Sequence, residues 1–369
     1  MKAFIHDKRI DMAELLEREV VAIPTSYGET VLQGKVILVT GAAGSIGSEL
    51  VAQLLNYRPE CVIALDTNET GLFELSENLR CHPQALRLKL HIGDITNVRS
   101  MTLLLASWQP HVIFHVAAYK HVPLLEAFPD QAVQTNVLAT YHLCQLAREH
   151  GVERFIFIST DKAADPTSVM GASKRVGEMI IQALAQEEGW NTCFCAVRFG
   201  NVIGSRGSVV PVFTQQIQQG GPMTITDPRA TRYFMTIPEA CGLVILAAAV
   251  AEQANLYLLD MGKPVRILDL AIKMLRLYGL HAGRDISIVY TGLRPGERLH
   301  ETLIGVNEEA IPTAHSKIIA IMPAEGDQVP PIHEWMQMLE YSLHYEDASQ
   351  LRQHLFALIQ GARLEQISR

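Results

Sequence analysis

The 369-residue chain lacks several features that would assign it to a specialised class of protein. None of its six cysteines forms a C-x-x-C pair, so we expect buried free thiols rather than a metal site or a disulfide framework. Its longest strongly apolar run, 243–251, is much shorter than the ~20 residues of a membrane-spanning helix. Charged residues interrupt the amino-terminal segment, so we expect no signal peptide and a cytoplasmic protein.

An excess of positive charge and linker sequences are absent as well. The formal net charge is −8, which argues against a general nucleic-acid-binding protein. We find no internal repeat, low-complexity tract or Ser/Pro-rich linker. The length suffices for two domains or for one large α/β unit with a second lobe. Without a linker, that lobe must be interwoven from the C-terminal part of the chain.

The sequence does contain a glycine-rich turn between a strand and a helix. Residues 35–40 form an apolar, β-branched run, and 48–55 has the spacing of a helix. The turn between them reads G-x-x-G-x-x-G, and such glycines let the backbone approach a pyrophosphate at the amino end of the helix. The candidate cofactor-binding residues of this turn are Gly41, Gly44, Ser45, Ile46 and Gly47.

Strands and helices alternate through 62–197, which predicts an α/β fold with a doubly wound parallel sheet of Rossmann type. The strand at 62–65 ends in Asp66, whose carboxylate suits ribose hydroxyls and would repel a 2′-phosphate. We therefore expect NAD rather than NADP. Further candidates for contact with the cofactor are Asp94, Ile95, Ala117, Ala118 and Asn136.

The most informative stretch follows a predicted buried strand at 154–158. Thr160, Asp161 and Lys162 stand at its carboxyl end, the edge of a parallel sheet at which ligands bind. An acid beside a base at that edge can protonate a leaving group and remove a proton from carbon. The alternative is structural, with Asp161 capping the next turn and Lys162 exposed to water.

The second half of the chain offers residues suited to an anionic substrate. The loop 198–208 combines polar and cationic groups with glycines, and an arginine before the Pro-Gly turn at 295–296 can clamp a diphosphate. The candidate substrate-binding residues are Lys120, His121, Asn201, Arg206, Arg232, Arg294 and Glu297. We expect an N-terminal extension at 1–33, an NAD-binding domain at 34–200 to which segments near 237–262 return, a substrate-binding lobe at 201–330 and a C-terminal helical segment at 331–369.

These motifs occur together in a known family. The glycine turn, Asp66, Asn136, the serine and threonine at the strand end, and Lys174 resemble the extended short-chain dehydrogenases/reductases over roughly residues 34–305. This resemblance implies a Rossmann fold, bound NAD and a role for Lys174 in binding the nicotinamide ribose.

A closer resemblance is to the nucleotide-sugar 4,6-dehydratases of bacterial polysaccharide pathways, which act on UDP-N-acetylglucosamine. The segments 117–126, 159–163 and 294–299 carry it. Residues 13–18 resemble the segment that precedes the catalytic domain in large membrane-anchored members, whose membrane half we expect to be absent. The resemblance implies a UDP-sugar substrate, and we expect a homo-oligomer.

One position departs from the wider family. The helix expected at 168–187 carries Met170 and Lys174 on one face, and most of the superfamily has tyrosine where this chain has Met170. Methionine cannot transfer a proton, so either redox chemistry has been lost or another group deprotonates the sugar. The membrane-anchored branch also carries methionine there and is active, which favours the second explanation.

The expected mechanism oxidises sugar C4, eliminates water across C5 and C6, and returns the hydride to C6. Thr160 forms a hydrogen bond with the 4-hydroxyl, and Asp161 deprotonates it. Asp161 then gives a proton to the departing C6 hydroxyl. We expect Lys162, close to Lys174 and to the positive nicotinamide ring, to be neutral enough to remove the C5 proton. A UDP-sugar 4-epimerase and a non-catalytic NAD-binding regulatory protein remain alternatives.

Overall fold

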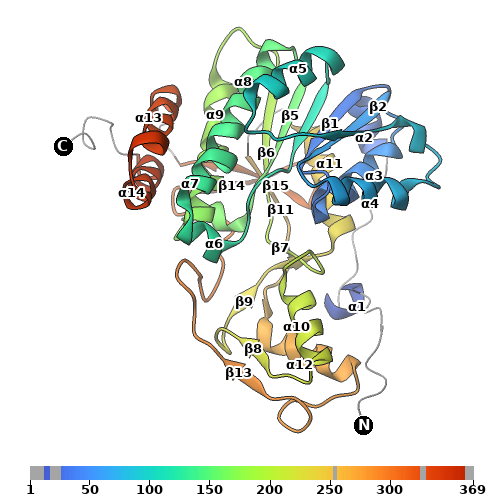
Figure 1. Cartoon of the computed structure of the whole chain (residues 1–369), viewed down its shortest axis with the longest axis vertical. Coiled ribbons are helices and arrows are strands. Elements are labelled where there is room, and N and C mark those ends of the chain that lie inside the picture. The colour runs from blue at the N-terminus through green and yellow to red at the C-terminus, as the bar shows by residue number, and fades with distance from the viewer. Residues whose placement is uncertain (1–11, 17–25, 252–255, 325–329, 362–369) are drawn as a thin grey trace.

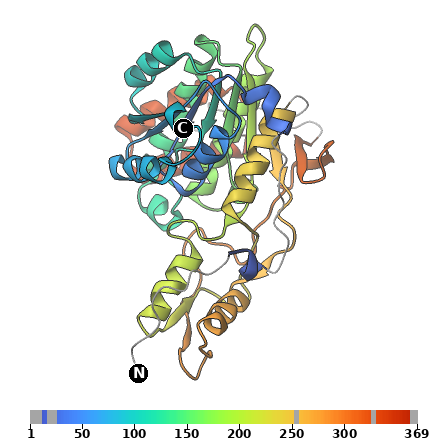
Figure 2. The ribbon, with the colours of Figure 1, turned by 90° about the vertical axis from the view of Figure 1, so that its right-hand side faces the viewer.

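A computed structural model describes residues 12–16, 26–251, 256–324 and 330–361 (Figure 1). It shows a large lobe around a nine-stranded sheet and a smaller lobe beyond it, with segments of the chain passing between the two (Figures 1 and 2). The expected segment 13–18 is only partly described, because residues 17–25 lie outside these ranges. The predicted domain boundaries stay a prediction.

The large sheet has the order β14-β15-β11-β6-β5-β4-β1-β2-β3. The strands from β3 to β11 in this order run parallel, whereas β15 and β14 are added antiparallel at one edge. This arrangement confirms the predicted Rossmann-type fold. The strands are β1 Val36–Thr40, β2 Cys61–Asp66, β3 Leu88–Ile92, β4 Val112–His115, β5 Arg154–Ile158, β6 Cys193–Arg198, β11 Leu256–Leu259, β14 Glu308–Pro312 and β15 Ile318–Pro323.

Helices cover both faces of this sheet, so its central strands are buried on both sides and consist of nearly continuous apolar residues. Side chains of alternating residues enter two separate cores, one on each face. One face carries α5 Val98–Trp108, α8 Ala139–Glu149 and α9 Val169–Gln186; the other carries α2 Ser26–Leu32, α3 Ser45–Leu55, α4 Glu69–Leu79 and α11 Ile237–Val250.

The smaller lobe has a third apolar core of its own. It is built from α10 Val209–Gln218, α12 Ile267–Leu277 and the parallel pair β8 Met223–Ile225 and β13 Ile288–Tyr290 (Figure 1). The short helix α1 Met12–Leu16 inserts Leu15 into this core. Two short strand pairs complete this half: β7 Asn201–Val202 with β10 Phe234–Met235, and β9 Thr231–Arg232 with β12 Val265–Arg266.

The C-terminal helices pack on the large lobe. Helices α13 Ile332–Tyr345 and α14 Ala348–Ile359 contact α9 and its neighbours, and they add Trp335, Leu339 and Leu355 to the core on that face. The remaining short elements are η1 Ala85–Arg87, α6 Val122–Ala127, α7 Pro129–Gln131, the π-helix η2 Ala132–Leu138 and η3 Asp161–Ala163.

Two expectations from composition can be compared with the structure. All six cysteines are free, but Cys81 is exposed and Cys193 is half-buried, so only the other four are the buried thiols that we expected. Among the helices that the structure describes, none has the length and apolar character needed to cross a membrane.

Candidate functional site

A cleft of about 700 Å³ lies at the carboxyl ends of the parallel strands. Residues predicted from separate motifs line it together, as expected when parallel strands end at one edge of a sheet. These are Gly41, Gly44, Ser45, Ile46, Asp66, Asp94, Ile95, Ala117, Ala118, Lys120, His121, Thr160, Lys162, Met170, Lys174 and Asn201.

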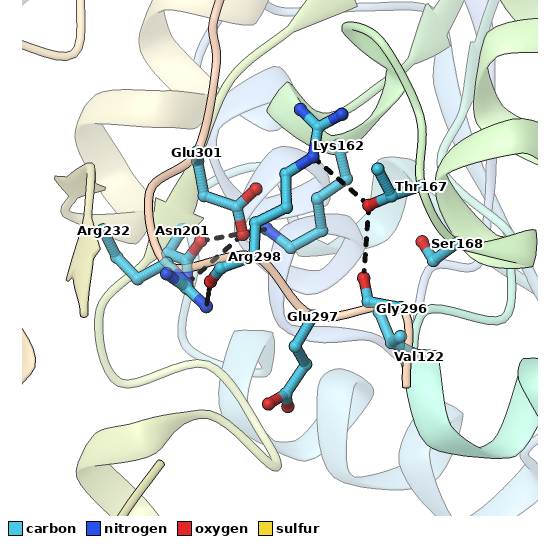
Figure 3. Close-up of a pocket in the computed structure, with 10 residues that line it drawn as sticks. All are labelled: Val122, Lys162, Thr167, Ser168, Asn201, Arg232, Gly296, Glu297, Arg298 and Glu301. Carbon is cyan, nitrogen blue, oxygen red and sulfur yellow. Dashed lines mark hydrogen bonds and ion pairs between the residues drawn. The ribbon is translucent and has the colours of Figure 1, made fainter. Parts of the chain in front are cut away.

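A smaller cavity of about 180 Å³ adjoins this cleft, since Lys162 and Asn201 line both. Figure 3 shows its polar lining, which comes from the loop after β5, from β9 and from the segment 296–301. Arg232 and Glu297 were predicted from the sequence, but Arg298 and Glu301 were not.

The cofactor end of the cleft is built by the glycine turn before α3. Gly41 has φ of +67°, and a Cβ there would lie 2.6 Å from the backbone nitrogen of Ala117. A Cβ on Gly47 would clash with the carbonyl oxygen of Gly41. The N-cap residue of α3, Gly44, provides no side-chain cap, so the first N–H groups of the helix can bind an anion at the positive end of the dipole.

The carboxylate of Asp66 is fixed beside this turn. Its Oδ2 accepts a hydrogen bond from the backbone N–H of Ala43 at 2.9 Å, and Oδ1 accepts one from the N–H of Asn68 at 2.9 Å. These contacts hold the carboxylate at the carboxyl end of β2, in the lining of the cleft. The turn, the helix end and this acid therefore fit an adenine dinucleotide.

Three of the predicted catalytic residues contact one another at the carboxyl end of β5. The hydroxyl of Thr160 and the ammonium group of Lys162 both donate to Asp161 Oδ1 at 2.9 Å. Asp161 is fully buried and lines neither cavity, and its Oδ2 has no hydrogen-bond partner among the described residues. The structure therefore places Asp161 behind Thr160 and Lys162, and we expected it to face the substrate directly.

The charge state of Lys162 also differs from our expectation. Burial lowers the pKa of its amine, but the carboxylates of Asp161 and Glu301 more than offset this effect and raise the pKa above its ordinary value. Lys162 Nζ lies 3.2 Å from Glu301 Oε1, and it donates to Asn201 Oδ1 at 3.3 Å. We expected an amine neutral enough to remove the C5 proton beside the nicotinamide ring, whereas these carboxylates favour the charged form of Lys162 in the protein without ligands.

The second lysine has opposite surroundings. Lys174 on α9 is buried, and its Nζ lies 3.9 Å from the ring centre of Phe157. Burial lowers the pKa of Lys174 to about 7, although the nearby carboxylate of Glu178 acts in the other direction. Met170, one turn earlier, lines the cleft with a thioether that cannot exchange a proton.

Asn136 lies behind the cleft, within the π-helix η2, and is buried. Its side chain donates to the carbonyl oxygen of Tyr119 at 2.9 Å and to Ser173 Oγ at 3.0 Å, and it accepts from the N–H of Tyr119 at 2.9 Å. It thereby ties the segment after β4 to α9. The residue that we predicted as a cofactor contact therefore holds the wall of the cleft.

Two buried groups near the strand ends were missed in the sequence. His115 lies between the hydroxyls of Thr40 and Thr140, at 2.8 and 2.9 Å, and burial lowers its pKa to about 3 with a contribution from Lys174, so the ring is neutral. Thr140 donates to the carbonyl oxygen of Asn136, which leaves Thr140 as acceptor from the imidazole.

The second missed group is a buried cluster around Arg198 at the end of β6. Its guanidinium group donates to Glu178 at 2.6 and 3.0 Å and to Glu308 at 2.7 and 2.9 Å. Ser159 Oγ, next to Thr160, donates to Glu178 at 2.6 Å. The cluster therefore anchors the carboxyl end of β5 to α9 and to the antiparallel edge strand β14.

The predicted substrate-binding residues are dispersed. Lys120 Nζ donates to the carbonyl oxygen of Arg206 at 3.0 Å, and Arg206 in turn contacts the glycine turn through the carbonyl of Ala43 at 3.1 Å. Burial and Arg206 lower the pKa of Lys120. The loop 203–208 therefore lies over the turn that we assign to the cofactor.

Two predicted arginines are placed differently. Arg232 donates to the carbonyl oxygens of Thr231, Arg298 and Leu299 and pairs with Glu301, so most of its N–H groups are already bonded. Arg294 is exposed and lines neither cavity. Its role as a diphosphate clamp stays a prediction.

Residues 37–323 match the polysaccharide biosynthesis protein family. The chain belongs to that family. It is 44% identical to the capsular polysaccharide biosynthesis protein CapD of Staphylococcus aureus over 82% of this chain and 50% of CapD. It is 41% identical to the probable polysaccharide biosynthesis protein EpsC of Bacillus subtilis over 94% of this chain and 57% of EpsC.

The family member described here thus spans about half the length of these two relatives. It is also 33% identical to a UDP-glucose 4-epimerase of Rickettsia canadensis, over 75% of this chain and 79% of the epimerase. The predicted family resemblance is confirmed at this level, and the 4,6-dehydratase branch stays a prediction.

Solved structures agree with this assignment. Pen from Bacillus thuringiensis is 31% identical and superposes with a TM-score of 0.73, covering 81% of this chain and 89% of Pen. The dTDP-glucose 4,6-dehydratase DesIV from Streptomyces venezuelae, solved with NAD bound, is 26% identical with a TM-score of 0.63, covering 73% and 88%. These neighbours support the prediction of NAD as the cofactor.

Proposed function

We propose that this family member is an NAD-dependent nucleotide-sugar 4,6-dehydratase, with UDP-N-acetylglucosamine as its substrate. The observation that carries the proposal is the arrangement at the end of β5, where Thr160 and Lys162 line the cleft and share one oxygen of the buried Asp161. An epimerase needs no proton transfer at C5 or C6, so it has no use for an acid and an amine coupled in this way.

The cofactor would bind along the glycine turn, with its ribose hydroxyls at Asp66 and its adenine near Asp94 and Ile95. Lys174 and the segment Ala117–Ala118 would lie at the nicotinamide end. Held there, NAD would supply the hydride acceptor for sugar C4 and the hydride donor for C6. Lys120, His121 and Asn201 in the cleft lining are the proposed substrate contacts.

Thr160 and Asp161 replace the missing tyrosine. The hydroxyl of Thr160 already donates to Asp161 Oδ1, so it can accept the proton of the sugar 4-hydroxyl while passing its own to the carboxylate. The reaction leaves this proton on Asp161, which is fully buried next to Thr160. The same proton later leaves with the C6 hydroxyl as water.

Lys162 acts at C5, where the 4-ketone acidifies the proton. It is the titratable side chain that lines both cavities, and it bonds to Asp161 and Asn201. As a free amine it removes the C5 proton, and the resulting ammonium returns a proton to C5 when C6 is reduced. Met170 takes no part in proton transfer and provides an apolar wall.

The test is mass spectrometry of UDP-N-acetylglucosamine after incubation with the purified protein in heavy water. We expect a product that has lost one water and gained deuterium at C5. A product of unchanged mass with inverted C4 would instead indicate the epimerase. No turnover, with a sugar-independent cofactor spectrum, would indicate the non-catalytic alternative.

A further inference from the structure

Glu301 lines the smaller cavity beside Lys162, and no motif pointed to it. Its side chain is 4% exposed, and Oε1 lies 3.2 Å from both Lys162 Nζ and Arg232 Nε. Figure 3 shows its carboxylate facing these two cations, whereas the carboxylate of Glu297 in the same segment points away from them. Asp161, Glu301, Lys162 and Arg232 together form a cluster with two negative and two positive charges.

The proton balance of the proposed reaction requires an acceptor other than Asp161 for the proton of Lys162. The cycle begins with Asp161 ionised and Lys162 charged. Once Asp161 has received the 4-hydroxyl proton, it cannot also accept the proton that Lys162 must lose before attacking C5. Asn201, the other hydrogen-bond partner of Lys162, has an amide oxygen that is not a base.

Among the described residues, Glu301 is the other carboxylate in contact with Lys162 Nζ. Arg232 keeps it in place, because the guanidinium group is itself fixed by three backbone carbonyls and stays charged. The position of Glu301 therefore does not depend on the state of Lys162.

We propose that Glu301 holds the proton of Lys162 during the elimination and returns it at the end of the cycle. This inference rests on the proposed dehydratase function and adds a residue to it. Glu301 does not contact reacting carbon atoms in this scheme; it is a positioning residue that sets the protonation of Lys162.

The steps balance as follows. Lys162 first passes one proton to Glu301 and becomes a neutral amine. The amine then takes the proton from C5, and the electron pair of the C5–H bond forms the C5–C6 double bond as the C6–O bond breaks. Asp161 gives its proton to the departing oxygen through Thr160. Lys162 then returns its proton to C5 as a hydride reaches C6, and Glu301 restores the charge of Lys162.

Glu301→Gln tests this role, because glutamine keeps the shape and the contact with Arg232 but cannot accept a proton. We expect the exchange of C5 hydrogen with deuterated solvent to fall about 100-fold, with the KM for the nucleotide sugar within roughly twofold of the original. Formation of the 4-ketone, followed by the absorbance of the reduced cofactor, should continue. Glu301→Asp should recover part of the exchange rate.

A pH profile separates this role from a structural one. In Glu301→Gln, Lys162 can lose its proton only to solvent, so the exchange rate should rise about tenfold per pH unit above neutrality. Glu309→Gln, which removes an exposed carboxylate of β14 outside this cluster, is the control and should behave like the unaltered protein.

Three outcomes overturn the inference: full C5 exchange in Glu301→Gln, loss of 4-ketone formation in parallel with exchange, or a loss of exchange that pH does not recover. If the unaltered protein forms no dehydrated product, the proposed function itself fails. That result is distinct, since it appears before any variant is compared.

Discussion

The two lysines at the cleft have pKa values shifted in opposite directions. Around Lys162, the carboxylates of Asp161 and Glu301 raise the pKa of the amine. Around Lys174, the walls are Phe157, Met170 and the apolar core of α9, and the pKa of the amine falls to about 7. Desolvation lowers the pKa at both sites, so it is the neighbouring acids that decide which lysine is charged.

This contrast suits the amines of Lys162 and Lys174 to different steps of the proposed reaction. A charged amine among acids can exchange protons with them, which suits acid–base chemistry at the sugar. A nearly neutral amine in an apolar wall can approach a positively charged nicotinamide ring without repulsion. Replacing Lys162 should therefore affect a different step from replacing Lys174.

The largest expected effect comes from replacing each lysine with methionine in turn. Lys162→Met should lower C5 exchange by about 1,000-fold, because the amine that removes the proton is gone, while the affinity for NAD changes little. Lys174→Met should instead weaken NAD binding. Isothermal titration with NAD and deuterium incorporation into product measure the two properties independently, and equal losses of both in each variant would abolish the distinction.

The next prediction concerns the buried cluster that lies behind both lysines. Arg198→Met leaves Glu178 and Glu308 without their shared cation, and we expect the free energy of unfolding to fall by about 3–5 kcal/mol. Denaturation in urea measures this. The exposed pair of Arg266 with Asp269 provides the control, since Arg266→Met should leave the midpoint unchanged. A loss of the same small size in both variants would show that the cluster does not anchor the strand end.

A third prediction uses pH to test the neutral state of Lys174. Its pKa is about 7 in the folded protein and ordinary, near ~10.4, in the unfolded chain, so the unfolded chain binds more protons between these values. The free energy of unfolding should therefore rise with pH across this window by roughly 3–4 kcal/mol more in the NAD-free protein than in Lys174→Met. Urea titrations at pH 6, 8 and 10 would measure it, and parallel profiles would contradict it.

The smallest expected effect is the contact between Lys174 and the ring of Phe157. A double-mutant cycle with Lys174→Met and Phe157→Leu should give a coupling energy of about 0.5–2 kcal/mol below pH 7, where the amine is charged. The coupling should vanish near pH 9. A pH-independent value would mean that the pair interacts through packing alone.

Much of the fold could be predicted because its signals are local. The apolar runs that became β1 and β5, and the glycine turn between β1 and α3, each require only neighbouring residues to be recognised. The cleft then follows from the geometry of parallel strands, which end together at one edge.

The charge states could not be predicted in the same way. Glu301 is far from Lys162 in the sequence, and without that contact Lys162 looked like an amine near a second lysine and therefore neutral. In the segment 294–301 we chose Arg294 and Glu297, of which only Glu297 lines the smaller cavity. The chain turns at Gly296, which has φ of +78°, and Arg298 and Glu301 beyond it line the cavity as well. Only the three-dimensional path of that loop distinguishes these pairs.

The position of Trp335 in α13 provides an intrinsic optical probe. The chain has three tryptophans, and Trp335 is fully buried whereas Trp108 and Trp190 are partly exposed. Detachment of the C-terminal helices would therefore shift the emission of Trp335 to longer wavelength. Fluorescence of the protein then follows the packing of these two helices on α9, while the absorbance of the nicotinamide reports on the cleft.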